Sequence, residues 1–524
     1  MRLQIRIFLS LTFCLTVDCL KILLYQPSFG HSHVNFVGKV ADVLIDAGHH
    51  VVILQPDFNP NHKPGSKKAE LIRISPNPEV AKTIKAVDEG LKVRWETPTF
   101  YFFTMAKMMR QFRKLNYEFC DELMQNETLI ERLRGYNFDY AMSQPFDVCG
   151  FGIFHRLHLD KFSILLSTSI SNSFSSMTGV PVALSYVPGM SGDASDRMTF
   201  WGRAKNTMSF LFEQFAVGSM ISQVDDLIKK YDPEYPGGLE QLNRACFMMP
   251  NTEPLFEFPM PTIYKIINIG GISVPPPSKA KITEEWNEIL NLRPHTILIS
   301  FGSLSKSVDM PNDFKIGLVE AMKELPDVTF IWKYEDPSDE GVKRGAENII
   351  LNKWVPQTDL LSDERLSGFM THAGAGSTNE LVLRGKKAIL IPMFGDQHHN
   401  ARVIEKHGSS ILLEKNDLKD QATLTKTIRQ LLHDPELDKA AKHLAKMIAE
   451  RPISPQEQLV KFTEFAAKHG PFPQLDPYGR QLSIFTFYLV DIIFSIIVIF
   501  FIFVFVLAYI FKKIFSRSSK TKTD

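Results

Sequence analysis

Residues 369–380 read FMTHAGAGSTNE, and this stretch decides the fold of the C-terminal half of the chain. An apolar run typical of a buried strand ends at Thr371, and His372 follows it directly. Gly374 and Gly376 come next, and glycine lets a backbone approach a ligand or another element closely. The stretch therefore predicts a strand, a glycine-rich turn and a helix, in that order.

The predicted helix would begin at Ser377 or Thr378. Because the free N–H groups and the dipole of a helix N-terminus attract anions, a diphosphate is a natural ligand for such a turn. Glu380 lies one turn further on, where its carboxylate could accept hydrogen bonds from sugar hydroxyls. Close packing of a strand against a helix is the alternative explanation for a turn of this kind.

The segments on either side of this motif predict two α/β domains of the doubly wound type. A chain of 524 residues exceeds the roughly 250–300 that one core can hold. The N-terminal half opens with a strand at 21–25, a loop at 28–33, a helix at 34–47 and a strand at 51–54. In the C-terminal half, strand-like runs alternate with helical segments and begin at Thr296, Val328, Asn348, Gly368 and Ala388. Two such domains facing across a cleft place ligands at the carboxyl ends of their strands.

Prolines cluster between residues 250 and 281 and indicate a linker, because proline fixes φ and removes an N–H donor. The predicted division is a signal peptide at 1–19, an N-terminal domain at 20–255, a linker at 256–290, a C-terminal domain at 291–450, a return segment at 451–488, a transmembrane helix at 489–511 and a tail at 512–524.

Both ends of the chain carry the patterns of targeting signals. Arg2 and Arg6 accompany an apolar run that is too short to span a bilayer and is typical of a cleaved signal peptide. Residues 492–511 carry no charge and are long enough to cross a hydrocarbon core of ~30 Å. The basic residues that follow predict a single-pass type I protein with its body in the lumen. The last residues, KTKTD, match a K-x-K-x-x retrieval pattern and predict the endoplasmic reticulum membrane.

Composition narrows the class of partner. A net charge of +1 gives no global basic excess for nucleic acid. Outside the signal region the chain has Cys120, Cys149 and Cys246, an odd number without C-x-x-C spacing, so we expect neither a disulfide framework nor a zinc site. His398 and His399 are adjacent and would diverge on a helix, so no metal is expected. Asn126 begins an Asn-Glu-Thr sequon and is a candidate glycosylation site.

Together with residues 391–397, IPMFGDQ, the opening motif closely resembles the signature of UDP-glycosyltransferases, in particular the animal membrane-bound UDP-glucuronosyltransferases. The resemblance extends from the signal peptide to the basic tail and includes residues 300–303, SFGS, and 354–357, WVPQ. It implies a GT-B fold, in which two Rossmann-like doubly wound domains face one another across a cleft. It also implies that the C-terminal domain holds a UDP-sugar and the N-terminal domain an acceptor.

The resemblance implies roles on the nucleoside side of the donor by position. Trp354 would stack on uracil, Gln357 would bond to the nucleoside and Glu380 would hold the ribose.

The same resemblance covers the phosphate and sugar side. His372 and Ser377 would contact the diphosphate, with Ser303 near it. Asp396 and Gln397 would bind the sugar hydroxyls.

Glycosyl transfer needs a base for the acceptor hydroxyl, and histidine suits this role because its pKa lies near neutrality. His33 follows the first strand at the place of the family's catalytic histidine, two residues after His31. Where the family supplies an acid, this chain has Gln144. Asp147 could take over that role, or it could only cap the helix that begins near Cys149.

Two departures from the family pattern, Gln144 and Lys387 in place of a proline, leave two functions open. The first is an inverting transferase with a histidine base and no metal. It would move a hexosyl group, expected to be glucuronosyl, from UDP-glucuronate or UDP-glucose to a hydroxyl or similar nucleophile of a small lipophilic acceptor. The second is a non-catalytic lumenal protein that binds a UDP-sugar or a partner. The membrane is an expected partner, and a homo-oligomer is compatible with either function. A dehydrogenase is disfavoured because G-x-G-x-x-G does not follow the first strand.

Overall fold

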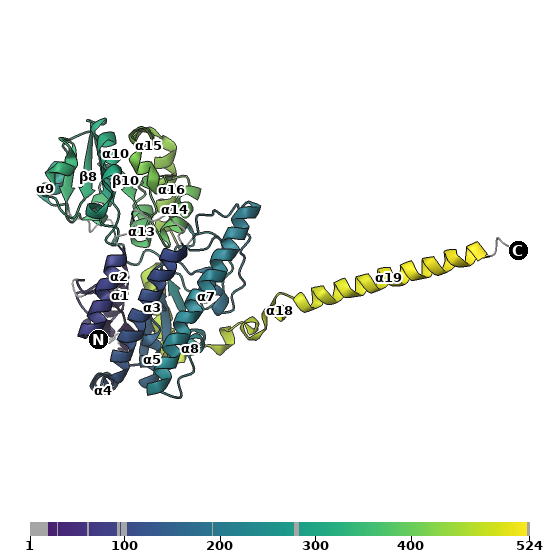
Figure 1. Ribbon diagram of the computed structural model, residues 1–524. Coiled ribbons are helices and arrows are strands. Elements are labelled where there is room, and N and C mark those ends of the chain that lie inside the picture. The colour runs from purple at the N-terminus through teal and green to yellow at the C-terminus, as the bar shows by residue number, and fades with distance from the viewer. Residues whose placement is uncertain are drawn as a thin grey trace, which may run out of the picture.

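The computed structural model describes residues 19–28, 30–59, 62–91, 95, 102–190, 192–276 and 282–520. They form two parallel β-sheets flanked by helices, and one long helix that leaves the body of the molecule (Figure 1). The expected signal peptide lies outside the described residues except for Cys19, and so does the end of the tail at 521–524.

The N-terminal sheet has the strand order β3-β2-β1-β4-β5-β6, with every pair parallel. Its central strands are continuous apolar runs because helices cover both faces. The strand order reverses direction between β1 and β4, which makes this the topological switch point of the sheet. The strands are β1 (Lys21–Tyr25), β2 (His50–Pro56), β3 (Glu70–Ile74), β4 (Tyr140–Ser143), β5 (Phe162–Leu166) and β6 (Met248–Pro250).

The C-terminal sheet repeats this winding in the order β12-β11-β10-β7-β8-β9, again with every pair parallel. Its switch point lies between β7 and β10. The expected fold class, two doubly wound Rossmann-like domains facing across a cleft, is therefore confirmed. The strands are β7 (His295–Ser300), β8 (Val328–Lys333), β9 (Ile349–Asn352), β10 (Leu366–Thr371), β11 (Ala388–Leu390) and β12 (Ser410–Leu412).

Helices cover both sheets. Around the first sheet they are α1 (His31–Asp46), α2 (Pro78–Leu91), α3 (Phe102–Gln125), α4 (Glu127–Arg134), α5 (Cys149–Arg156), α6 (Asn172–Met177), α7 (Phe200–Tyr231) and α8 (Gly238–Arg244). With the second sheet they are α9 (Glu284–Leu290), α10 (Asn312–Lys323), α11 (Glu340–Lys343), α12 (Gln357–Ser362), α13 (Ala375–Leu383), α14 (Gln397–Lys406), α15 (Gln421–His433) and α16 (Pro435–Ala449).

The chain then returns to the first sheet. Helix α17 (Pro455–His469) packs against α1, and Arg451 at the crossing forms an ion pair with Glu253 at 2.6 Å. The short helix α18 (Ile484–Phe487) leads into α19 (Val490–Lys520).

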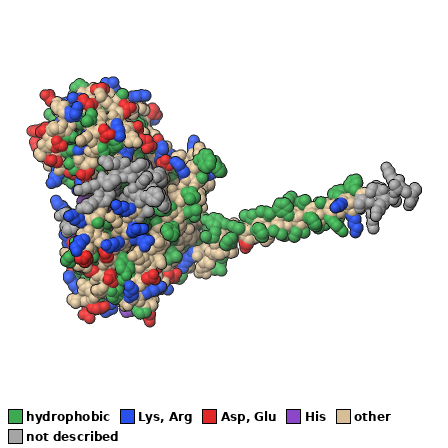
Figure 2. Space-filling model, in the orientation of Figure 1, with side chains coloured by type: hydrophobic (Ala, Val, Ile, Leu, Met, Phe, Trp, Pro, Cys, Tyr) green, Lys and Arg blue, Asp and Glu red, His purple; other side chains and the backbone are tan. Residues whose placement is uncertain are grey.

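Helix α19 is the one element in the described part of the chain that is long and apolar enough to cross a membrane, over Val490–Phe515. None of this segment is buried against the rest of the protein. Figure 2 shows its surface as an almost continuous cover of hydrophobic side chains.

Two local expectations are corrected. The first long helix begins at His31 rather than at Val34, because Gly30 is extended at φ −143° and its carbonyl already accepts from the Val34 N–H at 3.1 Å. The catalytic candidate His33 thus lies in the first turn of α1 and not in a loop.

The second correction concerns cysteine. Cys120 of α3 and Cys149 of α5 form a disulfide, with their Cα atoms 5.6 Å apart. The sequence did not indicate this disulfide, because the two cysteines are 29 residues apart and come together only where α3 packs against α5.

Candidate active site

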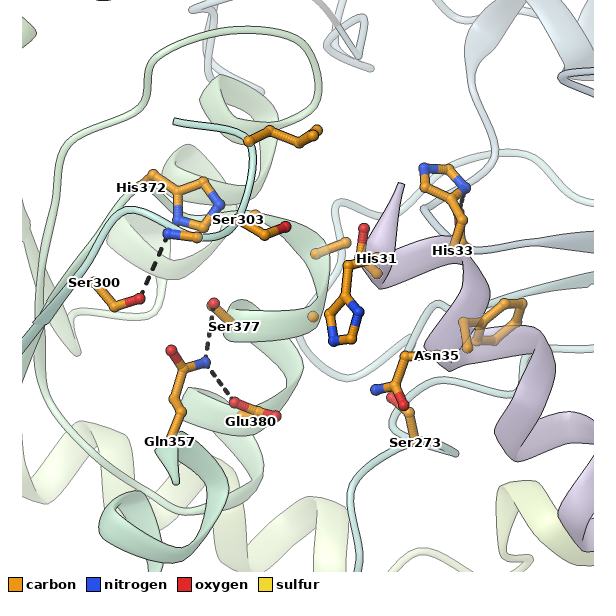
Figure 3. A pocket seen from close by; sticks show the side chains of 18 of the residues that line it. His31, His33, Asn35, Ser273, Ser300, Ser303, Gln357, His372, Ser377 and Glu380 are labelled. Atoms are coloured by element: carbon orange, nitrogen blue, oxygen red, sulfur yellow. Dashed lines mark hydrogen bonds between the residues drawn. The ribbon is translucent and has the colours of Figure 1, made fainter. Parts of the chain in front are cut away.

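A cleft of about 500 Å³ lies between the carboxyl ends of the two sheets. One wall is the start of α1, which follows β1, and the other comes from segments that follow β7, β9 and β10 (Figure 3). Both walls therefore sit at the switch points of their sheets. The structure brings every predicted donor residue and the predicted base into this one cleft: His33, Ser303, Trp354, Gln357, His372, Gly374, Gly376, Ser377, Glu380, Asp396 and Gln397.

His372 occupies a slot made by two glycines. A Cβ on Gly302 or on Gly374 would lie 2.6 Å from Nε2 of its ring, so both glycines are required for the ring to fit. Ala373, the next residue, has a left-handed φ of 61°, which is strained for a residue with a side chain and is typical of functional turns. Burial, reinforced by the nearby Lys333 cation, lowers the pKa of His372 to about 4.

The N-terminus of α13 faces the same cleft. Gly374 is its N-cap and supplies no side chain to its first N–H groups. A Cβ on Gly376 would meet open space, so a ligand can approach this backbone. Asp396 is half-buried beside the helix start, where it accepts from the Ala375 N–H and from Asn400 Nδ2 at 2.9 Å. Burial raises the pKa of Asp396 despite these hydrogen bonds.

Glu380 is held in place before any ligand binds. Gln357 Nε2 donates to Glu380 Oε2 at 2.5 Å and to Ser377 Oγ at 3.1 Å. Thr358 Oγ1 donates to Glu380 Oε1 at 2.7 Å. Burial is the largest influence on this carboxyl and raises its pKa. The result is a preorganised acceptor group in the floor of the cleft.

Trp354 presents an open aromatic face, with 61% of the residue exposed. The His31 ring packs edge-on against it at 5.6 Å between centroids, so the two sheets meet at this point. Lys333 Nζ lies 5.8 Å from the centre of the Trp354 ring.

Lys333 is a site residue that the sequence analysis missed. It ends β8, and its Nζ donates to Gly302 O and to Glu335 Oε1, both at 2.9 Å. Its charge contributes to the lowered pKa values of both His31 and His372. The signal that could have revealed it is its position at the carboxyl end of a central strand.

Gln397 and Ser303 complete the donor side. Gln397 lines the cleft, and its Oε1 accepts from the N–H groups of Met393 at 2.8 Å and Phe394 at 3.1 Å. Ser303 lines the cleft just after Gly302.

On the opposite wall, a chain of amides fixes the tautomer of His33. Gln26 Nε2 donates to Pro27 O at 2.6 Å, so its oxygen accepts from Gln144 Nε2. The oxygen of Gln144 then lies 2.9 Å from His33 Nδ1. Because an amide oxygen can only accept, Nδ1 carries the proton and Nε2 keeps a lone pair. Ser167 Oγ, 2.6 Å from Nδ1, is a second partner.

His33 is half-buried in the wall of the cleft, and desolvation lowers its pKa to about 4, although the hydrogen bond with Gln144 acts in the opposite direction. Gln144 thus occupies the position of the expected acid and contacts His33 without bringing a charge.

Asp147 has other partners. Its Oδ2 accepts from Tyr25 Oη at 2.6 Å and its Oδ1 from the Cys149 N–H at 2.9 Å. The second bond is the helix-capping alternative considered above. Burial raises the pKa of Asp147 to about 6. The structure therefore brings Gln144 to His33, and it ties Asp147 to Tyr25 and to the start of α5.

Lys387 and the adjacent histidines lie outside the donor contacts. Lys387 Nζ donates to Leu432 O at 3.0 Å, and this residue does not line the cleft. His399 is paired with Glu257 at 2.8 Å. Within the described ranges, no group of three or more metal-binding side chains comes together.

The fold and the donor-side geometry define a glycosyltransferase of the GT-B type. Solved structures share the fold: the glycosyltransferase VinC in complex with DTDP (14% identity, 86% of this chain and 100% of that chain, TM-score 0.56) and LpCGTa in complex with UDP (16% identity, 86% and 100%, TM-score 0.55). Among curated proteins, ugt-48 of Caenorhabditis elegans, which carries a provisional UDP-glucuronosyltransferase name, is 29% identical over 93% of this chain and 94% of its own length.

The family described as "UDP-glucoronosyl and UDP-glucosyl transferase" matches residues 21–523, nearly the whole chain. The chain belongs to this family and is a UDP-glycosyltransferase.

Proposed function

We propose that this enzyme transfers a hexosyl group, glucuronosyl in the first instance, from a UDP-sugar to a hydroxyl or similar nucleophile of a small lipophilic acceptor. One observation carries the proposal: His33, with Nε2 as its basic nitrogen, lines the same cleft as the preorganised donor-binding set. A base on one wall and a diphosphate site on the other is the arrangement that an inverting transfer requires.

The proposed donor pose follows the contacts of the C-terminal wall. Uracil stacks on the open face of Trp354, and the ribose hydroxyls donate to Glu380, which Gln357 and Thr358 hold. The diphosphate lies at the start of α13, where backbone N–H groups, Ser377 and His372 can donate to it.

The sugar lies toward Asp396 and Gln397 in this pose, and Ser303 lies near the diphosphate. Lys333 supplies positive charge that offsets the developing negative charge on the UDP leaving group. Its ammonium group lies close to both His372 and Trp354, which contact the donor in this pose.

In the proposed reaction, His33 Nε2 takes the proton of the acceptor hydroxyl as its oxygen attacks the anomeric carbon. The bond from that carbon to the UDP oxygen breaks on the opposite face, so the configuration inverts. With its lowered pKa, His33 is neutral at pH 7 and ready to accept a proton, but it is a weak base. The acceptor oxygen must therefore lose its proton late, as the bond to the sugar forms.

The test is a donor–acceptor screen of the full chain in detergent with UDP-glucuronate, UDP-glucose and a panel of phenols. We expect UDP release that depends on acceptor and is lost in His33→Ala. UDP binding without acceptor-dependent release from any donor would support the non-catalytic alternative instead.

The division of the chain is part of the proposal. Residues 20–255 form the acceptor-binding domain, 291–450 the UDP-sugar-binding domain, and 451–488 return the chain to the membrane. The cleft lies between the two sheets, in agreement with this division.

We also propose a type I anchor in the endoplasmic reticulum membrane, with residues 489–511 spanning it, the body in the lumen and a cleaved signal at 1–19. The uncharged stretch within α19 supports the span. Asn126 caps α4 through Oδ1 at 2.9 Å, which leaves its nitrogen available for a glycan. Glycosidase-sensitive mass on the full chain, lost in Asn126→Gln, would support lumenal exposure. Export of a Lys520→Ser, Lys522→Ser variant from the endoplasmic reticulum would show that the tail carries the retrieval signal.

A further inference from the structure

The first half of α7 exposes apolar side chains to the surface and turns polar side chains toward the protein. Its N-terminal turns carry large apolar side chains that are 53–75% exposed, and these are Phe200, Trp201, Met208, Leu211 and Phe215. At 100° per residue their directions fall within an arc of about 100°, so they form one stripe along the helix. Isolated exposed apolar residues are common, but a continuous stripe of this kind marks an interaction surface.

The opposite side of the same turns is polar and faces the protein. Asn206 is 3% exposed, and its Nδ2 donates to the carbonyls of Leu184 at 2.8 Å and Val187 at 2.9 Å. Its Oδ1 accepts from the Gly189 N–H at 2.8 Å. Glu213 is partly buried on this side, beside Ser171 and Ser173. The polar anchors fix the rotation of the helix, so the apolar stripe cannot turn inward.

Charge and residue type indicate what covers the stripe. Residues 197–215, which contain the stripe, include three exposed cations, Arg197, Arg203 and Lys205, and one acidic residue, Glu213, on the side that faces the protein. Aromatic side chains flanked by cations on an amphipathic helix are typical of a helix that lies in the interface of a bilayer with anionic headgroups. A soluble partner or a second copy places no such demand on the sign of the charge.

The stripe also belongs to the same side of the molecule as the anchor. In Figure 1 the N-terminal end of α7 projects toward the side from which α19 leaves, and Figure 2 shows hydrophobic side chains on both. The segment that precedes α7 also reaches the anchor: Ser176 at the end of α6, with Gly179 and Val180 after it, shares a small cavity of about 110 Å³ with residues from Gly479 to Tyr488 at the base of the anchor. Apolar exposure continues there at Ile484 and Phe485, which are 74% and 66% exposed.

We propose that the first half of α7 is a second membrane contact, which lies in the headgroup and upper acyl region of the bilayer that α19 crosses. This inference rests on the proposed anchor. The cleft is then held at a fixed orientation to the membrane, instead of swinging on the single helix α19, and lipophilic acceptors dissolved in the bilayer lie close to the N-terminal domain.

The tryptophans of the chain make the proposal testable. Of its five, Trp95, Trp286 and Trp332 are buried, and only Trp201 and Trp354 are exposed. The full chain is reconstituted into phosphatidylcholine–phosphatidylserine vesicles in which part of the phosphatidylcholine carries bromine at acyl carbons 6 and 7. We expect the bromolipid to quench tryptophan fluorescence in the wild type and in Trp354→Phe, and not in Trp201→Phe. Iodide in the buffer should quench tryptophan fluorescence in the wild type and in Trp201→Phe, and not in Trp354→Phe.

Moving the tryptophan to another position on the stripe tests whether the whole stripe, and not only residue 201, contacts the lipid. Phe215 lies on the same stripe and is 75% exposed, so the double variant Trp201→Phe, Phe215→Trp should regain bromolipid quenching. Equal quenching in wild type and Trp201→Phe would overturn the proposal. So would a Trp201 that is shielded from both bromolipid and iodide, which would assign the stripe to a second copy. Flotation of the same vesicles tests the anchor independently: a chain that floats without quenching at Trp201 contradicts the α7 contact alone.

Discussion

At the scale of single residues, the decisive feature is that the proposed base, His33, has a neutral hydrogen-bond partner. The amide chain from Gln26 through Gln144 sets the tautomer of His33 as a carboxylate would, but it does not stabilise the imidazolium that forms during proton transfer. Orientation and electrostatic support, which one acid often supplies together, are separated in this enzyme.

Introducing the missing charge is therefore informative. In Gln144→Glu the carboxylate should raise the pKa of His33 from about 4 toward its ordinary value of 6.5. A base works only when deprotonated, so the acid limb of kcat/KM should move from near pH 4 to higher pH. Turnover at pH 8 should rise roughly tenfold, a small part of what the triad carboxylate supplies in serine proteases.

This change replaces the amide that donates to Gln26, so Gln144→Asp, with a shorter reach, is the companion variant. Asp147→Asn is the matched control for charge. Because Asp147 bonds to Tyr25 and to the start of α5, its loss should lower stability and leave the acid limb in place. A pH profile that is moved by Asp147→Asn and not by Gln144→Glu would reverse these assignments.

Donor binding gives a second prediction. His372→Ala and Glu380→Ala should each weaken UDP binding about tenfold or more, because a charged hydrogen bond contributes roughly 1.5–3 kcal/mol. Calorimetry on the full chain in detergent measures this directly. Lys387→Ala, outside the cleft, is the control and should leave UDP affinity unchanged. Unchanged affinity in both active-site variants would remove this donor pose.

At the scale of elements, the donor site depends on how strands end. His372 and Ser303 each follow a central strand at the switch point, and two glycines create the slot for the imidazole ring. The geometry of the site is thus set by backbone turns as much as by the side chains that would contact UDP.

Gly374→Ala tests the slot. The added Cβ would lie 2.6 Å from His372 Nε2, and the ring is the part most able to move away. We expect UDP affinity to fall about as far as in His372→Ala, and the double variant to be no worse than either single one, because both changes remove the same contact. Gly376→Ala, whose Cβ meets open space in the first turn of α13, should raise the melting temperature of the ligand-free protein slightly, because alanine reduces the conformational entropy of the unfolded chain. Additive losses in the double variant would show that Gly374 acts separately from His372.

Sequence patterns predicted these elements unevenly. The order of strand, glycines and helix after β10 was readable because the three are contiguous, but the predicted helix start at Ser377 or Thr378 was wrong: α13 begins at Ala375 and includes Gly376. The start of α1 was not, since a histidine-rich stretch after a glycine carries no strong helix signal and only the Gly30–Val34 hydrogen bond shows where the helix begins. Lys333 was missed for a similar reason: its importance comes from β8 lying beside β7, which is a property of the sheet and not of the local sequence.

At the scale of the whole molecule, a side-chain contact made by the expected linker, residues 256–290, helps to join the two sheets. Glu257 follows the first sheet, and His399 in α14 belongs to the second. They form a buried ion pair at 2.8 Å between Oε1 and Nε2, and Ser169 also donates to Glu257. Nothing in the spacing of the sequence indicates this pair, because 142 residues separate its members.

A double-mutant cycle measures its contribution. Removing one member of a buried pair leaves the other without its charged partner, so Glu257→Gln and His399→Gln should each lower stability, by about 3 kcal/mol or more. The double variant should lose much less than their sum, with a coupling of about 2 kcal/mol. Thermal unfolding of the full chain, followed by the fluorescence of the buried Trp286 and Trp332, gives the stability of the single variants and of the double variant.

The pH dependence of that coupling is the sharper test. Pairing with Glu257 raises the pKa of His399 above its ordinary 6.5, against the opposing effect of burial. The stability that the histidine contributes is therefore complete below pH 6.5 and is lost as pH rises through its folded pKa. The pKa of Glu257 lies below its ordinary 4.5, and its contribution is present above pH 4.5 and is lost as pH falls through its folded pKa. The coupling should thus be greatest between about pH 4.5 and 6.5 and should decline at alkaline pH.

Lys406→Ala, which removes the more exposed contact of α14 with Asp196, is the matched control and should change stability by the same small amount at every pH in this range. A Glu257–His399 coupling that stayed constant to pH 9 would mean that the two side chains are joined by a neutral hydrogen bond and that charge plays no part in holding the two sheets together.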